Sequence, residues 1–232
     1  MKDLVKYFKM MKYALQAKMI FILAIIFFVL GILFELTDFS NHSSSYSLAS
    51  LYLALTAMYF YQLVFSTTVS KLVQSSPMKK KLQTVGPTAV TLITSLFTFT
   101  VYVVIRLIRI TPQFLEDNGT TYANTYSTIL FMAVWYFLFS AYMSISYKSY
   151  IISIVIVAVS VIAILVFGST TDIFINITDK LLIGGSNPVL LIVVSLGIIL
   201  IGSLVGYIIS LLLYKKPISD MAVRYALRQA SK

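Results

Sequence analysis

Six long apolar runs constrain the fold of this chain more than any other feature of its sequence. A hydrocarbon core about 30 Å thick is crossed by a helix of roughly 20 apolar residues, and each run is close to that length. The runs cover residues 19–36, 48–69, 88–110, 126–147, 149–168 and 189–213. The composition is 59% hydrophobic and only 11% charged, whereas soluble domains carry about 25% charged residues. The sequence therefore predicts an all-α membrane protein with six transmembrane helices.

The fourth and fifth runs are separated only by Lys148 and nearby serines. One helix over both runs would be roughly 65 Å long, about twice the thickness of the hydrocarbon core, so a tight hairpin is predicted at Lys148. The six runs form one transmembrane domain, residues 19–214. Residues 1–18 before it have the pattern of an amphipathic helix lying at the membrane interface, and residues 215–232 after it form a basic cytoplasmic tail.

The distribution of charge predicts the orientation of the chain, because Lys and Arg gather on the cytoplasmic side of a membrane. With the N-terminus inside, 15 of the 18 Lys and Arg residues fall on the cytoplasmic side. Only Arg106, Arg109 and Lys180 fall outside, and most of the acidic residues accompany them there. We therefore expect a multi-pass protein with both termini in the cytoplasm.

A short basic segment connects the second and third runs. Ser76 suits the N-cap of a helix whose first residue is Pro77, and Gly86-Pro87 ends or kinks that helix. Its apolar face holds Met78, Leu82 and Val85, and its other faces hold Lys79, Lys80 and Lys81. The pattern predicts a short amphipathic helix on the cytoplasmic membrane surface. The alternative is that these lysines only retain the loop in the cytoplasm.

This basic segment carries a family resemblance. The sequence SSPMKKKLQT, followed by a proline and a Thr-rich run, resembles ABC-2-type permeases of Gram-positive bacteria, in which a short helix at this place contacts the ATPase. The six runs and the basic amphipathic N-terminus extend the resemblance over nearly the whole chain. Within the family, the chain is most similar to permeases of staphylococcal exporters of phenol-soluble modulins, which are amphipathic peptide toxins.

The resemblance implies a permease subunit in a bacterial plasma membrane that works as a dimer with two copies of a separate cytoplasmic ABC ATPase. The Ser76 to Val85 helix would contact that ATPase, and the exported substrate would be an amphipathic peptide. ATP and Mg²⁺ are expected on the ATPase, because this chain has no G-x-x-x-x-G-K-[ST] loop for phosphates. A stand-alone membrane transporter or an immunity protein without an ATPase partner is the alternative.

A polar stripe on the third run is the candidate for a translocation path. Its residues recur every three or four positions and so share one face of a helix. They are Thr88, Thr91, Ser95, Thr98, Tyr102, Arg106 and Arg109, and a shorter stripe on the second run contains Thr56 and Tyr59. Two alternatives remain open: the hydroxyls bond to their own backbone and pack against a neighbouring helix, and the arginines pair with Glu116 and Asp117.

The chain offers few groups for catalysis in a membrane. It contains no cysteine and a single histidine, His42, in the first outer loop. No H-E-x-x-H motif or paired glutamates suggest a metal site, so we expect no catalytic, cofactor-binding or metal-binding residues. The net charge of +10 follows the side of the membrane and does not indicate a nucleic-acid partner.

Two features remain in the last third of the chain. Gly202 and Gly206 form a GxxxG motif in the last run, and small residues at this spacing let helices approach closely, so both predict a packing contact. Residues 169–188 contain an apolar stripe between two runs. The stripe predicts a short helix, either re-entrant or part of an ordinary outer loop.

Overall fold

The computed structural model describes Lys9, Met11, Ala14 and residues 17–37, 48–67, 79–118, 121–170 and 173–220. Regular structure in this part of the chain is helical. The helices are α2 (Ala17–Thr37), α3 (Leu48–Thr67), α5 (Lys79–Gln83), α6 (Val85–Arg109), α7 (Pro112–Asn118), α8 (Tyr122–Ser146), α9 (Tyr150–Thr170), α10 (Ile173–Leu181) and α11 (Val189–Leu213). The prediction of an all-α protein is confirmed for these residues.

Five helices among the described residues are long and apolar enough to cross a membrane. They are α2, α3, α5 continued by α6, α8 and α11. Helix α9 is 21 residues long, and its apolar stretch of described side chains runs from Tyr150 to Ile162. The chain is therefore a multi-pass helical membrane protein, and five of the six expected spans are present as such helices.

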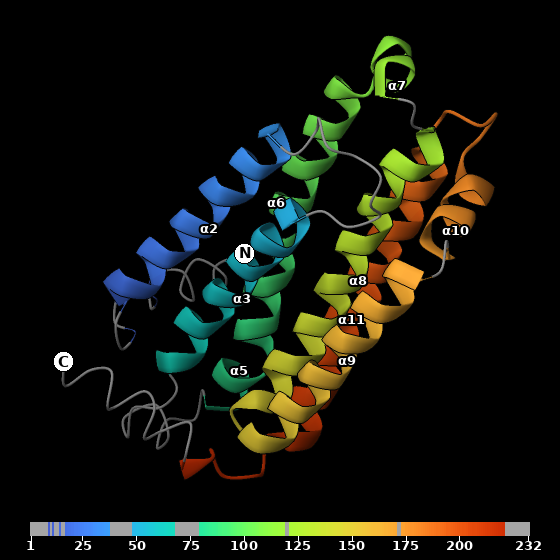
Figure 1. Ribbon diagram of the computed structural model, residues 1–232. Coiled ribbons are helices and arrows are strands. Elements are labelled where there is room, and N and C mark those ends of the chain that lie inside the picture. Colours follow the sequence, from blue (N-terminus) through green and yellow to red (C-terminus); the bar gives the residue numbers. More distant parts are fainter. Residues whose placement is uncertain are drawn as a thin grey trace.

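Helix α8 lies at the centre of the bundle, where α3, α6, α9, α10 and α11 all pack against it (Figure 1). Most of its length is buried, and Ile129, Met132 and Ala133 are fully buried in the main hydrophobic core. Helix α2 lies at one side and packs mainly on α3. The polar and aromatic side chains that face α8 are therefore shielded from the surroundings of the bundle.

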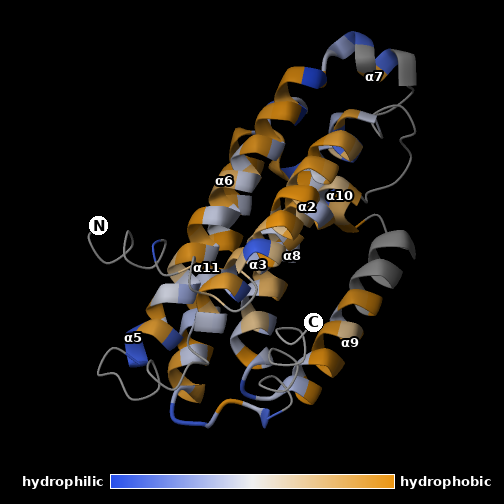
Figure 2. Cartoon of the chain, turned by 90° about the vertical axis from the view of Figure 1, so that its left-hand side faces the viewer, coloured by the Kyte–Doolittle hydropathy of each residue, from blue (hydrophilic) through white to orange (hydrophobic). Residues whose placement is uncertain are grey.

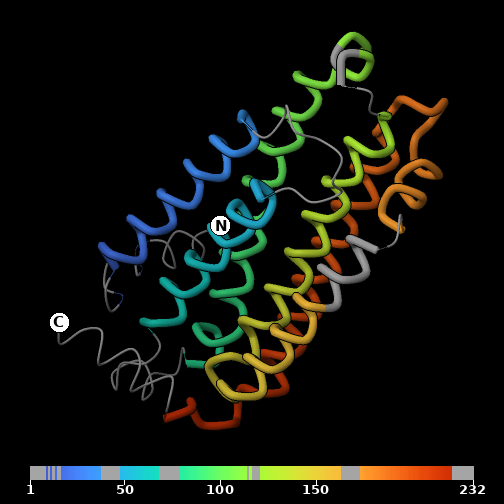
Figure 3. The backbone as a smooth tube through the Cα atoms, in the orientation of Figure 1, coloured from blue at the N-terminus to red at the C-terminus, as the bar shows by residue number. Residues whose placement is uncertain are grey.

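Successive long helices run in opposite directions, so the segments that connect them lie at two opposite ends of the bundle. Helix α5, the turn between α8 and α9 and the end of α11 lie at one end, and α7 and the start of α8 lie at the opposite end (Figures 1 and 3). We name the first the basic end, because it carries Lys79, Lys80, Lys81, Lys148, Lys215 and Lys216. Figure 2 shows hydrophilic residues on α5 and α7 at the two ends and hydrophobic residues along the long helices between them.

Several of the long helices present apolar side chains to the outside of the bundle. Ile22 on α2, Val159 on α9 and Leu212 on α11 are 55%, 61% and 76% exposed. Apolar faces of this extent are unusual on soluble monomers but suit contact with lipid chains, where the backbone bonds are satisfied within each helix.

Local sequence accounts for two helix boundaries that the apolar runs alone do not set. Helix α8 begins at Tyr122, four residues before the predicted span, because the Thr121 hydroxyl accepts a hydrogen bond from Asn124 N as an N-cap. The predicted hairpin at Lys148 is confirmed: α8 ends at Ser146 and α9 begins at Tyr150. The amides of Lys148 and Ser149 both donate to Ile145 O in this turn.

The segment before the last span contains the short helix α10. It packs beside α8, with Phe174 edge-on to Phe131 at 5.5 Å. Ile173 and Ile177, two members of the predicted apolar stripe, are instead exposed by 46% and 42%. A short helix is therefore present in the region predicted to hold one, and the face that it turns toward the bundle is only partly the apolar stripe.

Candidate functional site

The predicted coupling helix differs in its limits from the helix in the structure. Ser76, Pro77 and Met78 lie outside the described residues, and α5 covers Lys79–Gln83. Of the two predicted effects of Gly86-Pro87, an end to the helix or a kink, the structure shows an interruption, and α6 begins before these two residues, at Val85. The break lies earlier, at Thr84, because Pro87 has no N–H to donate to the carbonyl of Gln83 four residues before it.

The lysines and the apolar residues of the predicted coupling helix face different surroundings. Lys80 and Lys81 are exposed, and Lys79 is half-buried. Leu82 is only 3% exposed and packs in a cluster with Leu63, Val64 and Val90 of the same chain. Val85 belongs to α6 and is exposed. A partner at the basic end would therefore meet the lysines, whereas Leu82 holds α5 against the bundle.

A hydrogen-bond network at the basic end was not foreseen from the sequence. The Lys148 ammonium donates to Gln83 Oε1 at 3.1 Å and to the backbone oxygen of Lys216 at 2.7 Å. In return, Lys216 Nζ donates to Ser149 Oγ at 2.7 Å. The network joins α5, the α8–α9 turn and the segment after α11. Its one sequence signal was Lys148, a lone charge between two apolar runs.

Burial and charge both act on Lys148, which is 7% exposed and lies in the turn between α8 and α9. Desolvation by burial lowers the pKa of its ammonium from the usual 10.5 to about 8, and the positive charge of Lys79 adds to the effect. Both acceptors of Lys148 are neutral oxygens, so they do not offset this loss of hydration as a carboxylate would.

Two more contacts hold the basic end together. The Lys80 ammonium lies 6.0 Å from the centre of the Tyr214 ring, at the end of α11, within the range of a cation–π interaction. Ser219 N donates to Tyr147 O at 2.9 Å, and the Tyr147 ring stacks on Phe65 of α3 at 3.8 Å. Three segments that are distant in sequence thus meet around α5, namely α3, the α8–α9 turn and the end of α11.

The predicted translocation stripe on α6 is buried inside the bundle. Its members from Thr88 to Arg106 are each less than 9% exposed, and Arg109 is half-buried. The hydroxyls of Thr88, Thr91 and Thr98 donate to backbone oxygens four residues earlier on the same helix. Thr98 also bonds to the Tyr136 hydroxyl on α8. The stripe therefore forms helix-packing contacts of the kind given above as the alternative.

The shorter stripe on α3 divides between the interior and α2. Thr56 is 3% exposed and donates to Tyr52 O. The Tyr59 ring stacks on Phe27 of α2 at 5.2 Å. The two residues predicted to share a path therefore face different neighbours.

The two arginines of α6 contact α2, whereas one alternative from the sequence paired them with Glu116 and Asp117, and the Asp117 side chain lies outside the described residues. The Arg106 guanidinium forms an ion pair with Glu35, with a hydrogen bond of 3.1 Å from Nη2 to Oε2. Arg109 Nη1 donates to the backbone oxygens of Glu35 and Leu36 at 3.2 and 2.7 Å. Charged groups within a span are costly unless paired, and Glu35 supplies the opposite charge.

Gly202 and Gly206 lie where α11 crosses α8. A Cβ added at Gly202 would come within 2.7 Å of Phe137 Cα, and one at Gly206 would come within 2.5 Å of Ser140 Oγ. Contacts this short do not fit even a methyl group, so both glycines permit the close approach of the two helices.

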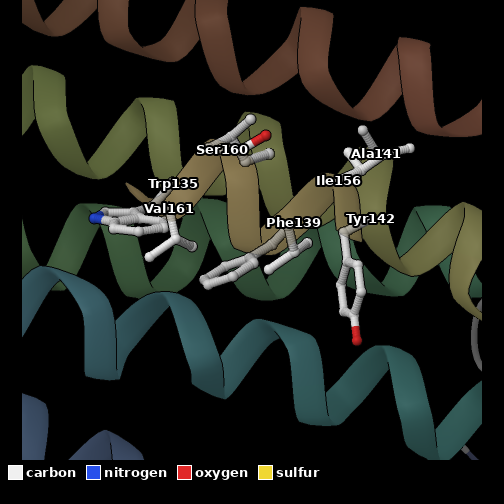
Figure 4. Close-up of a pocket in the computed structure, with 9 residues that line it drawn as sticks. Trp135, Phe139, Ala141, Tyr142, Ile156, Ser160 and Val161 are labelled. Atoms are coloured by element: carbon white, nitrogen blue, oxygen red, sulfur yellow. The ribbon is translucent and has the colours of Figure 1, made fainter. Parts of the chain in front are cut away.

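The stripe residues line neither of two cavities that are formed by described residues. One is a small apolar space of about 40 Å³ between α8 and α9, lined by Trp135, Phe139, Tyr142, Ile156 and Ser160 among others (Figure 4). The other is an open depression at the end opposite to α5, with Glu116 and Asp179 in its lining. No three His, Asp or Glu side chains in the described ranges come together in a way that could hold a metal ion.

Comparison with known proteins adds no assignment, since no family model, curated protein or solved structure matches this chain.

Proposed function

We propose that this chain is the permease subunit of an ATP-driven exporter of the ABC-2 type, located in a bacterial plasma membrane with both termini in the cytoplasm. It crosses the membrane six times, with α9 as the fifth span. It works with a second permease copy and a separate cytoplasmic ATPase that binds ATP and Mg²⁺. The exported substrates are amphipathic peptides such as phenol-soluble modulins.

The observation that carries the proposal is the placement of α5. This short helix follows the second long helix, continues into the third and lies at the basic end of the bundle, which carries most of the lysines that the structure describes. Lys80 and Lys81 are exposed there while Leu82 anchors α5 to the bundle. A partner with an acidic surface could therefore contact the positively charged lysines on the exposed face of α5, while Leu82 on the inner face packs against the bundle.

The buried stripe of α6 bears on how export would occur. Its hydroxyls satisfy backbone oxygens within the bundle, so a peptide could reach them only after α6 separates from α8. In the proposed cycle, ATP-dependent movement of the ATPase displaces α5 and opens the bundle around α6. This is a shift between two conformations driven by a partner that binds them unequally.

The test is co-purification with the ATPase of the same operon, followed by an assay of ATP hydrolysis. We expect the intact chain to retain the ATPase, and the double variant Lys80→Glu, Lys81→Glu to lose it. Lys180→Glu is the matched control, since Lys180 is also exposed but lies on α10. Absence of any complex with the intact chain would favour the alternative of a stand-alone transporter or immunity protein.

A further inference from the structure

One buried lysine connects the segments that meet at the basic end. Lys148 Nζ is within hydrogen-bond distance of Gln83 Oε1 on α5 and of Lys216 O beyond α11, and Lys148 itself sits in the turn between α8 and α9. Gln83 is 2% exposed, and its Nε2 atom has no hydrogen-bond partner among the described residues. The bond from Lys148 is therefore the polar contact that fixes the Gln83 side chain.

The backbone on the other side of Gln83 is weakened. Helix α5 has five residues and is separated from α6 by the break at Thr84, where Pro87 cannot donate the usual helical bond. Such a break permits α5 to rotate relative to α6, as element ends do in hinge motions. The packing of Leu82 holds α5 against α3 and α6, so a displacement of α5 reaches α8 and α9 only through a contact with the turn between them.

We propose that Lys148 is the positioning residue that ties α5 to the α8–α9 turn and to the end of α11, so that a displacement of α5 moves these helices together. The inference deepens the proposed function, because it names the route by which movement of an ATPase would reach the bundle. The two acceptors sit on segments on either side of Lys148, so one ammonium holds both.

The tie is tested first without any partner, on the purified chain in lipid nanodiscs. Since the chain has no cysteine, spin labels at Lys81→Cys and Ile151→Cys report the distance between α5 and the start of α9 by double electron–electron resonance. We expect Lys148→Met to at least double the width of the distance distribution. Lys148→Arg, which keeps charge and donors, should stay closer to the unaltered chain, and the exposed Lys215→Met should have no effect.

A double-mutant cycle separates a direct tie from a general loss of order. If Lys148 acts through Gln83, then Gln83→Leu should widen the same distance distribution. The double variant Gln83→Leu, Lys148→Met should then give a distribution no wider than that of Lys148→Met alone. Gln83→Leu also serves as the second variant where Lys148→Met fails to fold. An unchanged distribution in folded Lys148→Met, or strictly additive widths, would overturn the tie.

The second measurement uses the complex with the ATPase, reconstituted in vesicles with a fluorescent amphipathic helical peptide as the probe. Lys148→Met should still bind the ATPase, but peptide transported per ATP hydrolysed should fall about fivefold or more, the range of ordinary coupling between sites. An unchanged amount of peptide transported per ATP hydrolysed would refute the role of Lys148 in transmitting movement from α5, and it would leave the proposed function intact. If no ATPase binds the intact chain, the proposed function fails, and the nanodisc distances still decide whether Lys148 holds α5.

Discussion

Arg106 on α6 and Glu35 on α2 form a buried ion pair, with 7% and 1% of their surfaces exposed. The same guanidinium donates to Thr125 O on α8 at 3.3 Å and lies 5.3 Å from the Tyr102 ring. The pair therefore connects three helices near the end opposite to α5. Because each charge is shielded from water, each depends on the other for compensation.

Removal of one partner of this pair should destabilise the protein severely. Glu35→Leu leaves the Arg106 charge buried and uncompensated, at a cost of about 3–5 kcal/mol. The double variant Glu35→Leu, Arg106→Leu should recover much of the loss, since it buries no charge. Fluorescence-detected size-exclusion chromatography after heating in detergent measures both effects. Equal abundance of all forms would show that the pair contributes little.

The same pair predicts how the arginines affect export. Changing Arg106 and Arg109 to Gln should lower protein abundance without a dependence on the charge of the peptide. Export rates of an acidic and a cationic peptide, normalised to protein level, measure this. A rate that falls for one peptide and not for the other would place the arginines on the peptide path instead.

The contact between α11 and α8 should tolerate no side chain at Gly206. An added methyl group would meet Ser140 Oγ at 2.5 Å and Ser140 O at 2.9 Å, and overpacking of this kind costs about 1–3 kcal/mol. Gly197→Ala is the control on the same helix, because its Cβ would meet nothing within 4 Å and alanine favours a helix by about 1 kcal/mol. We expect the apparent Tm to fall for Gly206→Ala and to hold or rise for Gly197→Ala.

Lys148 predicts a pH dependence of stability on the alkaline side. The pKa of its ammonium is lowered by burial to about 8 in the folded chain, against 10.5 when solvated. Between these values the unfolded chain holds a proton that the folded chain has released, so the contribution of Lys148 to stability rises with pH. The apparent Tm of the unaltered chain minus that of Lys148→Met should therefore increase from pH 7.5 to pH 10.

The Lys79 charge supplies the control for this dependence. Lys79→Gln removes a positive charge that lowers the pKa of Lys148, so the increase should begin at a higher pH in that background. A Tm difference that stays constant across the range would contradict the assignment.

Leu82 and the lysines beside it should separate folding from partner binding. Leu82 is packed within the chain, so Leu82→Asp would bury a charge without a partner and should reduce the yield of folded protein. Lys80→Glu with Lys81→Glu changes exposed positions and removes only the contact of Lys80 with the Tyr214 ring. Yield and apparent Tm should therefore fall far less than for Leu82→Asp. A normal yield of Leu82→Asp that binds no ATPase would instead assign Leu82 to the partner interface.

The orientation of the chain is testable at described, exposed positions. A cysteine at Ser186, just before α11, should react from outside with an impermeant thiol reagent in intact cells, whereas one at Lys81 should react only after permeabilisation. The absence of native cysteine keeps the background low. External labelling at Lys81 would reverse the orientation.

The sequence by itself determined the class of fold. Apolar runs as long as a bilayer is thick must become helices, because no water is available there to satisfy an open backbone. Local patterns also predicted the turn at Lys148 and a short basic helix before α6. These features depend on residues close together in the chain, and therefore periodicity and composition suffice to find them.

Only the tertiary structure decided which side chains meet. Arg106 pairs with Glu35, 71 residues earlier in the chain, because α2 packs beside the end of α6 that lies opposite to α5. Leu82 was expected to face a partner and is buried by α3 and α6. The hydrogen-bond acceptors of Lys148 are on Gln83 and Lys216, which lie 65 and 68 residues away in the sequence. Each outcome depends on how the helices pack, and a helical repeat shows which residues share a face but not which neighbour covers it.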